Sequence, residues 1–322
     1  MRGCLHWFCT ILLNGRMEFV TLMLVNQSLC LARLPRAGLG NKLLVWGRAR
    51  VFANLNGLPF QVTGWNHFSP GAIIRGEIGR QYFGHFRGQK EISQWAWLRA
   101  RALFKKIRDP DVATIVPAAS RIYVFQKVPH WGDYFEHIRD HREMIRTALL
   151  DAVAQPFRNQ AACLPAPVIG LHVRHGDFRT LKPGEDFARV GLVRTPLTYF
   201  KLVVQLIRDV AGAPLPVTVF SDGHPEALAE LLALPNVTRH QPRAAITDLL
   251  LMSRSRILVT SAGSTFSYWA AFLSEAAVLL HPSHIHAPLR PAAVNGKIFE
   301  GPAPSVVGEC PALLRDNIRA IR

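Results

Sequence analysis

One stretch of the sequence places a guanidinium and a carboxylate directly after an apolar run. Residues 167–173 read PVIGLHV, Arg174 follows, and Asp177 stands three residues further on. A short apolar run predicts a buried parallel strand, and open α/β sheets bind ligands at the carboxyl ends of their strands. A cation and an acid at such an end predict an anion-binding site, and an ordinary ion pair in an exposed turn is the alternative.

Two later segments repeat this change from apolar to small polar residues. The run 217–220 leads into SDG, and the run 257–260 leads into SAGST. In a parallel sheet all strands point the same way, so their carboxyl ends line one edge. We therefore expect the three turns to build one site.

The turn after residue 260 has the composition of a phosphate site. Small residues let the backbone approach a ligand, and the free amides at the start of the following helix favour negative charge. Ser264 and Thr265 add two hydroxyl donors. Either hydroxyl could instead cap the helix, and capping is compatible with phosphate binding.

The segments between these strands have helical patterns. Thr195 and Pro196 predict the N-cap and the first helical position of a helix. Apolar residues at helical spacing follow, and we expect this helix to end at Gly212. Further helices are expected over 225–234, 244–253 and 264–273, and a further strand over 276–280. This alternation predicts a doubly wound, Rossmann-like domain.

Four motifs together resemble a known family. The Arg174 turn, the turn 220–222 (FSD) and the segment 250–271 (LLMS to STFSYWAA) resemble the three ordered motifs of the alpha-1,2-fucosyltransferases and their fucosyltransferase-like relatives. The segment 37–44, AGLGNKLL, is similar to that family's early Gly-Gly-Leu-Gly-Asn-Gln signature. The resemblance spans most of the chain, and it is firm from about 168 to 281.

The resemblance implies a GT-B-like α/β fold, in which two Rossmann-like domains face a cleft and the C-terminal parallel sheet binds the nucleotide sugar. It implies an inverting transferase that uses GDP-fucose as donor and needs no metal ion or other cofactor. By position, the resemblance implies donor-binding roles for residues of the N-terminal segment, the three turns and the start of the helix over 264–273: Gly38, Gly40, Asn41, His172, Arg174, Ser221, Asp222, Ser264, Thr265 and Phe266.

Within this set the resemblance implies different tasks. Arg174 would hold the diphosphate, and Ser264 with Thr265 would bind phosphate oxygens. Asp222 would lie toward the guanosine together with the phenyl ring at 266, and the N-terminal residues would close over the donor. His172 would support the loop rather than transfer a proton.

The chemistry demands positive charge independently of the resemblance. Negative charge grows on the diphosphate as the glycosyl bond breaks, and a guanidinium with oriented amides can stabilise it. The general base stays open among Asp177, His175, Glu185 and Asp186. Asp177 is kept as a catalytic candidate, although orientation of Arg174 is the interpretation that we favour for it.

Four positions depart from the family pattern. His175 stands where the alpha-1,2 enzymes usually have a second arginine and is reminiscent of the alpha-1,6 branch, so the linkage is open. Ala262 and Gly263 replace asparagine and serine. Lys42 replaces glutamine, and it could contact phosphate or be a solvated helix lysine, of which we favour the second.

The length of 322 residues and a hydrophobic content of 49% allow two domains with cores of their own. Residues 1–22 are predicted as a leader or non-domain extension, and 23–155 as an N-terminal acceptor-side α/β domain. Three prolines predict a linker over 156–167. Residues 168–322 form the predicted C-terminal domain, and its last helix, over 310–322, could cross back onto the first domain.

The net charge of +16 is compatible with nucleic acid, an anionic membrane or a phosphate-rich substrate as partner. The basic aromatic segment 95–108 could be an interfacial helix or a solvated helix packed by its aromatics. Aromatics over 64–87 could stack on acceptor sugars or fill a core, and we favour the core. The histidines at 281, 284 and 286 have no carboxylate or cysteine in their segment, so no metal site is predicted.

Five cysteines without metal-ligand spacing favour a reducing compartment. We therefore expect a cytoplasmic, bacterial protein with an optional peripheral contact at the inner face of the membrane. The favoured function is transfer of fucose from GDP-fucose to a glycan or lipid-linked oligosaccharide, as a galactoside alpha-1,2-fucosyltransferase of surface polysaccharide synthesis without a nucleic-acid partner. The alternatives are another donor sugar or linkage, and a non-enzymatic basic protein that binds nucleic acid or anionic membrane.

Overall fold

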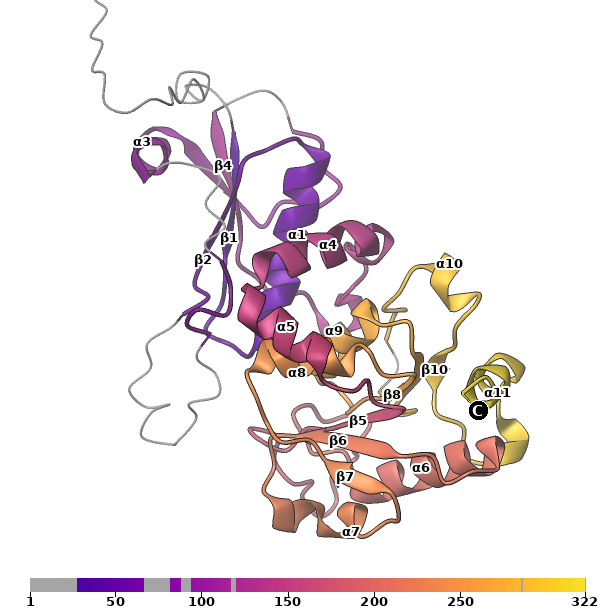
Figure 1. Ribbon diagram of the computed structural model, residues 1–322. Coiled ribbons are helices and arrows are strands. Elements are labelled where there is room, and N and C mark those ends of the chain that lie inside the picture. The colour runs from indigo at the N-terminus through magenta and orange to yellow at the C-terminus, as the bar shows by residue number, and fades with distance from the viewer. Residues whose placement is uncertain (1–27, 67–81, 88–93, 117–119, 285, 322) are drawn as a thin grey trace, which may run out of the picture.

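The computed structural model covers residues 1–322 and describes residues 28–66, 82–87, 94–116, 120–284 and 286–321 (Figure 1). The predicted leader over 1–22 and most of the aromatic segment 64–87 lie outside the described residues. The described chain forms two α/β parts, each built on a parallel sheet. The predicted α/β fold with two Rossmann-like units is confirmed.

The N-terminal sheet has four parallel strands in the order β2-β1-β4-β3. Its elements are β1 (Leu29–Arg33), α1 (Leu39–Leu55), β2 (Phe60–Thr63), α3 (Gln94–Leu103), β3 (Lys105–Arg108), β4 (Arg121–Phe125), α4 (Arg142–Ala152) and α5 (Gln155–Cys163). Alternate residues of β1 face opposite sides, because Cys30 packs with α1 whereas Leu29 and Leu31 pack with α3. This sheet is therefore covered on both faces.

The C-terminal sheet has six parallel strands in the order β10-β9-β8-β5-β6-β7. Its strands are β5 (Ile169–Val173), β6 (Val217–Ser221), β7 (Val237–Arg239), β8 (Ile257–Val259), β9 (Ala277–Leu280) and β10 (Glu300–Pro302). Its helices are α6 (Leu197–Ala211), α7 (Ala229–Leu232), α8 (Ala245–Met252), α9 (Thr265–Leu273), α10 (Ala292–Asn295) and α11 (Ala312–Arg319). Ile169 and Leu171 pack with α6 and α11, whereas Leu258 and Val278 pack with α8 and α9. Burial on both faces explains why these strands are apolar without alternation.

The strand register brings the three predicted turns to one edge. Leu171 of β5 pairs with Val219 of β6 and with Val259 of β8. The turns after these strands therefore begin side by side, as the sequence predicted.

The helices predicted between the strands are present, with ends that differ by a few residues. α6 ends at Gly212, which takes the left-handed conformation with φ of 60°. Thr195 does not cap this helix, because Pro196 occupies the N-cap position and the Thr195 hydroxyl accepts a hydrogen bond from the Ala262 amide. The segment predicted as one helix over 225–234 is a 3₁₀ turn followed by α7.

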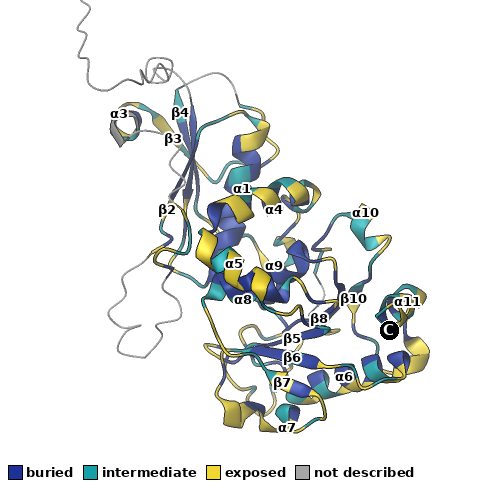
Figure 2. Cartoon of the chain, viewed as in Figure 1, coloured by how far each residue is buried: buried dark blue, intermediate teal, exposed yellow. Residues whose placement is uncertain are grey.

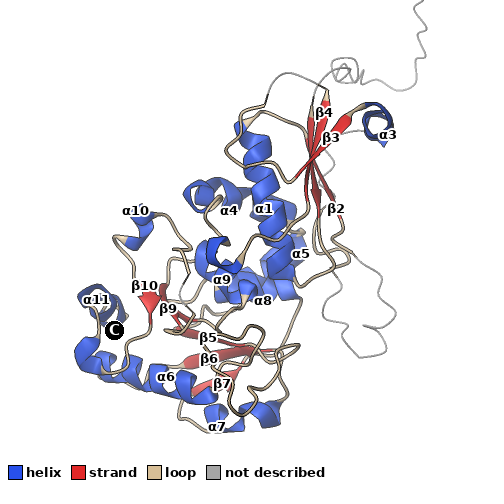
Figure 3. Cartoon of the chain, turned by 180° about the vertical axis from the view of Figure 1, so that it is seen from behind, coloured by secondary structure: helices blue, strands red, loops and turns tan. Residues whose placement is uncertain are grey.

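A shared apolar core joins the two parts. A Cβ at Gly47 of α1 would lie 3.3 Å from the ring of Trp269 on α9. Arg142 of α4 is 3% exposed and donates to the carbonyls of Phe272 (2.6 Å) and Ser274 (2.8 Å) at the carboxyl end of α9. Figure 3 shows that α1, α4, α5, α8 and α9 lie between the two sheets, and Figure 2 shows buried residues on α1, α8 and α9 in this layer.

The structure differs from the prediction at two connections. The segment 156–167 contains most of α5, because Pro156 lies in the first turn of that helix, where its fixed φ and missing amide are tolerated. The terminal helix α11 packs against α6 and β9 of its own part rather than against the N-terminal part. Within the described residues, no helix combines the length and apolar character that crossing a bilayer requires.

Candidate active site

Side-chain hydrogen bonds tie the three turns into one structure. The Ser261 hydroxyl donates to the carbonyl of His172 at 2.7 Å and accepts from the amide of Arg174 at 2.8 Å, which joins the first turn to the third. Asp222 Oδ1 accepts from the amides of His175 (2.9 Å) and Gly176 (3.0 Å), which joins the first turn to the second. The backbone before and after Arg174 is therefore fixed from both sides.

The Arg174 guanidinium lies between two carboxylates. Nη1 contacts Asp222 Oδ2 at 2.5 Å, and Nη2 contacts Asp177 Oδ1 at 2.6 Å. The guanidinium also lies 5.7 Å from the centre of the Phe178 ring, and its side chain keeps 21% of its surface exposed. A guanidinium has five N–H donors, so these two contacts leave donors for a further anion.

Asp222 is held by the protein through both of its oxygens. Beyond the contacts already described, a Cβ at position 176 would lie 2.2 Å from Asp222 Oδ2, so the first turn requires Gly176 at this point. Ser221 closes the second turn, since its hydroxyl accepts from the amide of Gly223 at 3.0 Å. These contacts give Asp222 a positioning task, and its orientation toward a guanosine stays a prediction.

Side-chain hydroxyls accept hydrogen bonds from two backbone amides of the third turn. Gly263 has φ of 68°, a conformation that favours glycine, and its amide donates to the Tyr268 hydroxyl at 2.8 Å. The amide of Ala262 donates to Thr195 Oγ1 at 3.0 Å. Ser264 stands at the N-cap of α9 without a side-chain capping bond, so its hydroxyl does not serve as the cap.

The N-terminal glycine segment lies directly on the start of α9. The Thr265 hydroxyl donates to Asn41 Oδ1 at 3.0 Å, across the two parts of the chain. A Cβ at Gly40 would lie 2.5 Å from Thr265 Oγ1 and 2.7 Å from the amide nitrogen of Phe266. Gly38, in contrast, has no atom within 4 Å of a Cβ built on it. The structure thus brings the predicted N-terminal residues to the predicted phosphate turn, with Gly40 in backbone contact.

Two histidines of the first turn are buried beside this centre. His172 is 4% exposed, its ring centre lies 5.5 Å from that of Phe266, and burial places its pKa far below the usual range. Burial first and the charge of Arg194 second lower the pKa of His175, whose ring packs on Gly223. Both imidazoles are therefore neutral near pH 7 and add no positive charge to the site.

Lys42 overturns the sequence interpretation. It is neither a phosphate contact nor a solvated lysine, because it is 2% exposed and its ammonium donates to the carbonyls of Pro35 (3.0 Å) and Gly64 (2.5 Å). Burial lowers its pKa to about 8. Because Pro35 and Gly64 follow β1 and β2, Lys42 fixes the loops at that sheet edge under the glycine segment.

Several residues that shape the site escaped the sequence analysis. Thr195, Ser261 and Tyr268 each hold a backbone group of the first or third turn. A polar residue after an apolar run was a usable signal for Ser261. Thr195 gave none, because the hydrogen bond that it accepts joins segments 67 residues apart. Tyr268 lies in the motif that carries the resemblance, but no local pattern indicates that its hydroxyl accepts from the Gly263 amide.

No group of three or more histidine, cysteine, aspartate or glutamate side chains suited to a metal ion occurs in the described part of the chain. His284 Nε2 lies 3.0 Å from the carbonyl of Phe187, and His286 Nδ1 lies 2.8 Å from that of Ala287. These two histidines of the predicted proline-flanked loop therefore contact backbone carbonyls.

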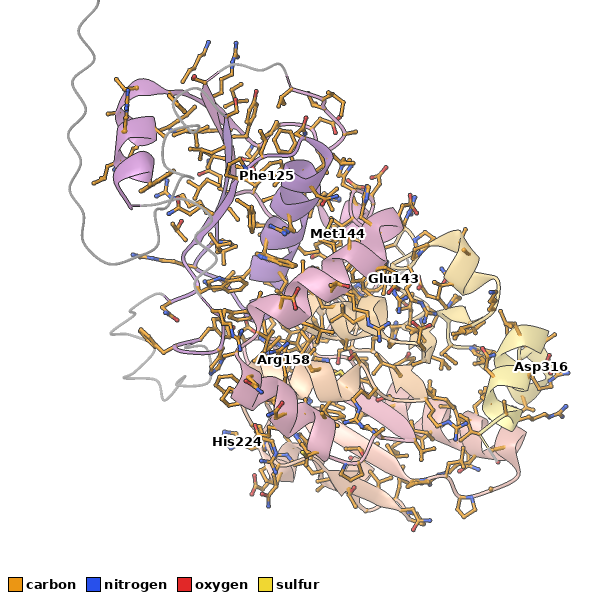
Figure 4. All side chains as sticks on the ribbon, turned by 45° about the horizontal axis from the view of Figure 1, so that its top comes forward. Phe125, Glu143, Met144, Arg158, His224 and Asp316 are labelled. Carbon is orange, nitrogen blue, oxygen red and sulfur yellow. The ribbon has the colours of Figure 1, made fainter. Side chains whose placement is uncertain are left out.

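A cavity of about 480 Å³ lies away from the three turns. It opens between α4, α5 and the end of α8, and Arg158 on α5 marks its position where the two parts meet (Figure 4). None of the predicted site residues lines it. It therefore says nothing about the anion site at the carboxyl ends of the strands.

Comparison with known proteins gave structural likeness only. No protein-family model matches the chain, and a search of curated proteins found no match. Among solved structures, the chain is similar to the NodZ alpha-1,6-fucosyltransferase soaked with GDP-fucose, with 16% identity, 77% of this chain and 93% of that chain covered, and a TM-score of 0.48. The chain is also similar to a mutant of Arabidopsis thaliana FUT1 in complex with GDP, with 12% identity, 84% of this chain and 72% of that chain covered, and a TM-score of 0.47. For the E. coli heptosyltransferase WaaC with ADP the identity is 11%, 90% of this chain and 99% of that chain are covered, and the TM-score is 0.42.

Proposed function

We propose that the protein is an inverting GT-B glycosyltransferase that moves fucose from GDP-fucose to a hydroxyl of a glycan. The observation that carries the proposal is the position of Arg174, held by two carboxylates where three strand ends and the start of α9 meet. The glycine segment of the other part contacts the same helix start. This is the arrangement that a metal-independent diphosphate site would need.

In the proposed reaction the acceptor hydroxyl oxygen attacks the anomeric carbon from the face opposite the diphosphate, and the hydroxyl proton passes to solvent water. The bond from that carbon to the phosphate oxygen breaks, and the electron pair stays on the diphosphate. The unused donors of Arg174 and the first amides of α9 would stabilise the new charge, together with the Ser264 hydroxyl. Asp222 would keep the guanidinium in place while this charge forms.

In this proposal Arg174 is the one cation of the first turn that would face the diphosphate. The neutral His175 cannot replace the second arginine of the alpha-1,2 pattern, since burial disfavours its charged form. We retain alpha-1,2 transfer to a galactoside as the proposed linkage, and alpha-1,6 transfer is the alternative that His175 favours. Asp177 is bound to Arg174, which supports a positioning role over the role of general base.

We further propose that the acceptor is a surface-polysaccharide precursor, either a free glycan or a lipid-linked oligosaccharide, and that the protein works in the bacterial cytoplasm beside the membrane. The charge of +16 supports a location near anionic phosphates. A different donor sugar would leave the diphosphate chemistry unchanged, so the donor must be established by direct comparison.

Nucleotide binding tests the proposal. GDP at a hundred times its Kd should stabilise the protein by about 2.7 kcal/mol, and ADP and UDP should do so less at the same concentration. The rate of GDP release from GDP-fucose, compared with GDP release from GDP-mannose and UDP release from UDP-galactose, then establishes the donor. If no nucleotide stabilises the protein, and if it binds any polyanion with an affinity that falls steeply with salt, the results would favour the non-enzymatic basic protein instead.

A further inference from the structure

The outer end of the N-terminal part carries a surface of one charge sign. Residues 94–108, QWAWLRARALFKKIR, contain five cations and no acidic residue. They form α3 and the strand β3, which pairs with β4 alone at the edge of its sheet. We call this surface the basic edge and define it by its charged and exposed apolar residues: Leu98, Arg99, Arg101, Leu103, Lys105, Lys106 and Arg108.

Packing fixes the direction in which the basic edge faces. Trp97, Ala100 and Phe104 lie at helical spacing and pack against the sheet in a small cluster with Ile122. The rest of the α3 surface consequently faces solvent, and Leu98 is 46% and Leu103 is 67% exposed on it. Two large apolar side chains thus stand among cations on a face that the sheet cannot cover.

None of the five cations forms an ion pair with an acid in the described residues. The acid that follows β3, Asp109, directs Oδ1 to the amides of Gln126 (2.8 Å) and Lys127 (2.9 Å) instead. Lysines on an edge strand discourage pairing with other chains, which would account for Lys105 and Lys106. That explanation leaves the exposed leucines unexplained.

We propose that the basic edge docks on an anionic phospholipid bilayer, with Leu98 and Leu103 inserted at the boundary between headgroups and acyl chains. Cations attract the surface by charge, and apolar side chains among them gain from burial in the interface. Figure 1 shows α3 at the end of the N-terminal part that is remote from α6 and α7, so docking there leaves the C-terminal part free. The inference deepens the proposed function, because docking would bring the site to a lipid-linked acceptor. Only this use of docking rests on the proposed function, whereas binding to the bilayer does not.

Vesicle sedimentation with the full chain tests the proposal. Binding should be strong to vesicles of phosphatidylcholine with phosphatidylglycerol and weak to phosphatidylcholine alone. Lys105→Ser combined with Lys106→Ser should weaken binding by about 30-fold at low salt, since each cation near the surface contributes about fivefold. The matched control is Lys297→Ser with Arg319→Ser, two exposed cations of the C-terminal part, which should change binding by less than about threefold.

The leucines separate insertion from attraction by charge alone. Leu103→Ser should weaken vesicle binding by about tenfold, whereas Leu202→Ser on α6, where the leucine is also 67% exposed, should leave it unchanged. Equal effects of the two pairs of cation substitutions, or of the two leucine substitutions, would overturn the proposal. Tighter binding to single-stranded RNA than to anionic vesicles, weakened by the same two lysine changes, would also overturn it and assign the surface to nucleic acid.

Thermal stabilisation by GDP is measured on the same variants. It should be unchanged in all of them, because these residues lie outside the site. Lost vesicle binding with intact GDP binding in the lysine variant supports docking. Absent GDP binding in the unmodified chain with normal vesicle binding refutes the nucleotide proposal and leaves docking standing.

Discussion

Replacing Arg174 with alanine gives the most direct test of the site. The Arg174 guanidinium contacts Asp177 of its own turn at 2.6 Å and Asp222 of the second turn at 2.5 Å. Its remaining donors are the groups that we expect to meet charge on the departing diphosphate. Arg174→Ala removes them while leaving the backbone bonds made by Ser261 and Asp222 Oδ1.

The expected loss in rate is much larger than the expected loss in stability. A preorganised charge-assisted contact in a transition state is worth about 3 kcal/mol, so release of GDP from GDP-fucose should slow by about a hundredfold or more. The two ion pairs are partly exposed, at 21% for Arg174, 47% for Asp177 and 35% for Asp222. Solvent screening therefore limits the loss in unfolding free energy to about 1 kcal/mol.

Turnover and thermal unfolding should be measured on the same preparations. The matched control is Arg179→Ala, because Arg179 also contacts a carboxylate, Glu185, at 2.6 Å but lies outside the three-turn contacts. Arg174→Lys should fall between the two, since a lysine keeps the charge and loses the planar fork. If Arg174→Ala melts like the parent and turns over within about threefold of it, the diphosphate role is wrong.

Three further predictions concern the framework around the site. Gly40→Ala should lower the unfolding free energy by about 1–3 kcal/mol, because its Cβ would meet the α9 backbone, whereas Gly38→Ala has open space and should be near neutral in thermal unfolding. The pKa of Lys42 is about 8 when folded and 10.5 in its ordinary state, so the unfolded chain binds more protons between these values. Stability relative to Lys42→Met should therefore rise with pH over that window by up to about 3 kcal/mol, and a flat difference in urea titrations would contradict the burial argument. Arg142→Leu should cost about 3 kcal/mol in urea unfolding, because it uncaps α9, while Arg146→Leu, whose ion pairs are 3.7 Å or longer, should cost less than about 1 kcal/mol.

The sequence could predict the sheet edge because its signals are local. An apolar run that ends abruptly in polar residues marks the end of a buried strand, and parallel pairing then places such ends together. Apolar spacing and Gly212 defined α6 in the same local way. The strands β7 (VTR) and β10 (EGP) contain no apolar run, so they were missed, whereas the equally short β8 (ILV) was found.

Contacts between distant segments account for the errors. Thr195 before a proline matches an N-cap pattern, yet its hydroxyl is used 67 residues away at Ala262. Lys42 lies on α1, which is buried on nearly all sides because sheet and α9 both cover it, so a helical lysine there cannot reach solvent. Pro156 lies in the first turn of α5, where proline is tolerated, and only packing against α8 decides that the helix forms.

The charges around Arg174 constrain how a diphosphate could enter. Two carboxylates against one guanidinium leave the centre negative, so an incoming anion must open one ion pair or be repelled. Asp222 cannot leave, because its Oδ1 holds the amides of His175 and Gly176 and its movement would dismantle the first turn. Asp177 is 47% exposed and contacts the same guanidinium from a neighbouring position on its own turn, so solvent can replace that contact at low cost. The ion pair to Asp177 is therefore the one that donor binding would exchange, and the ion pair to Asp222 is the one that keeps the guanidinium aimed throughout.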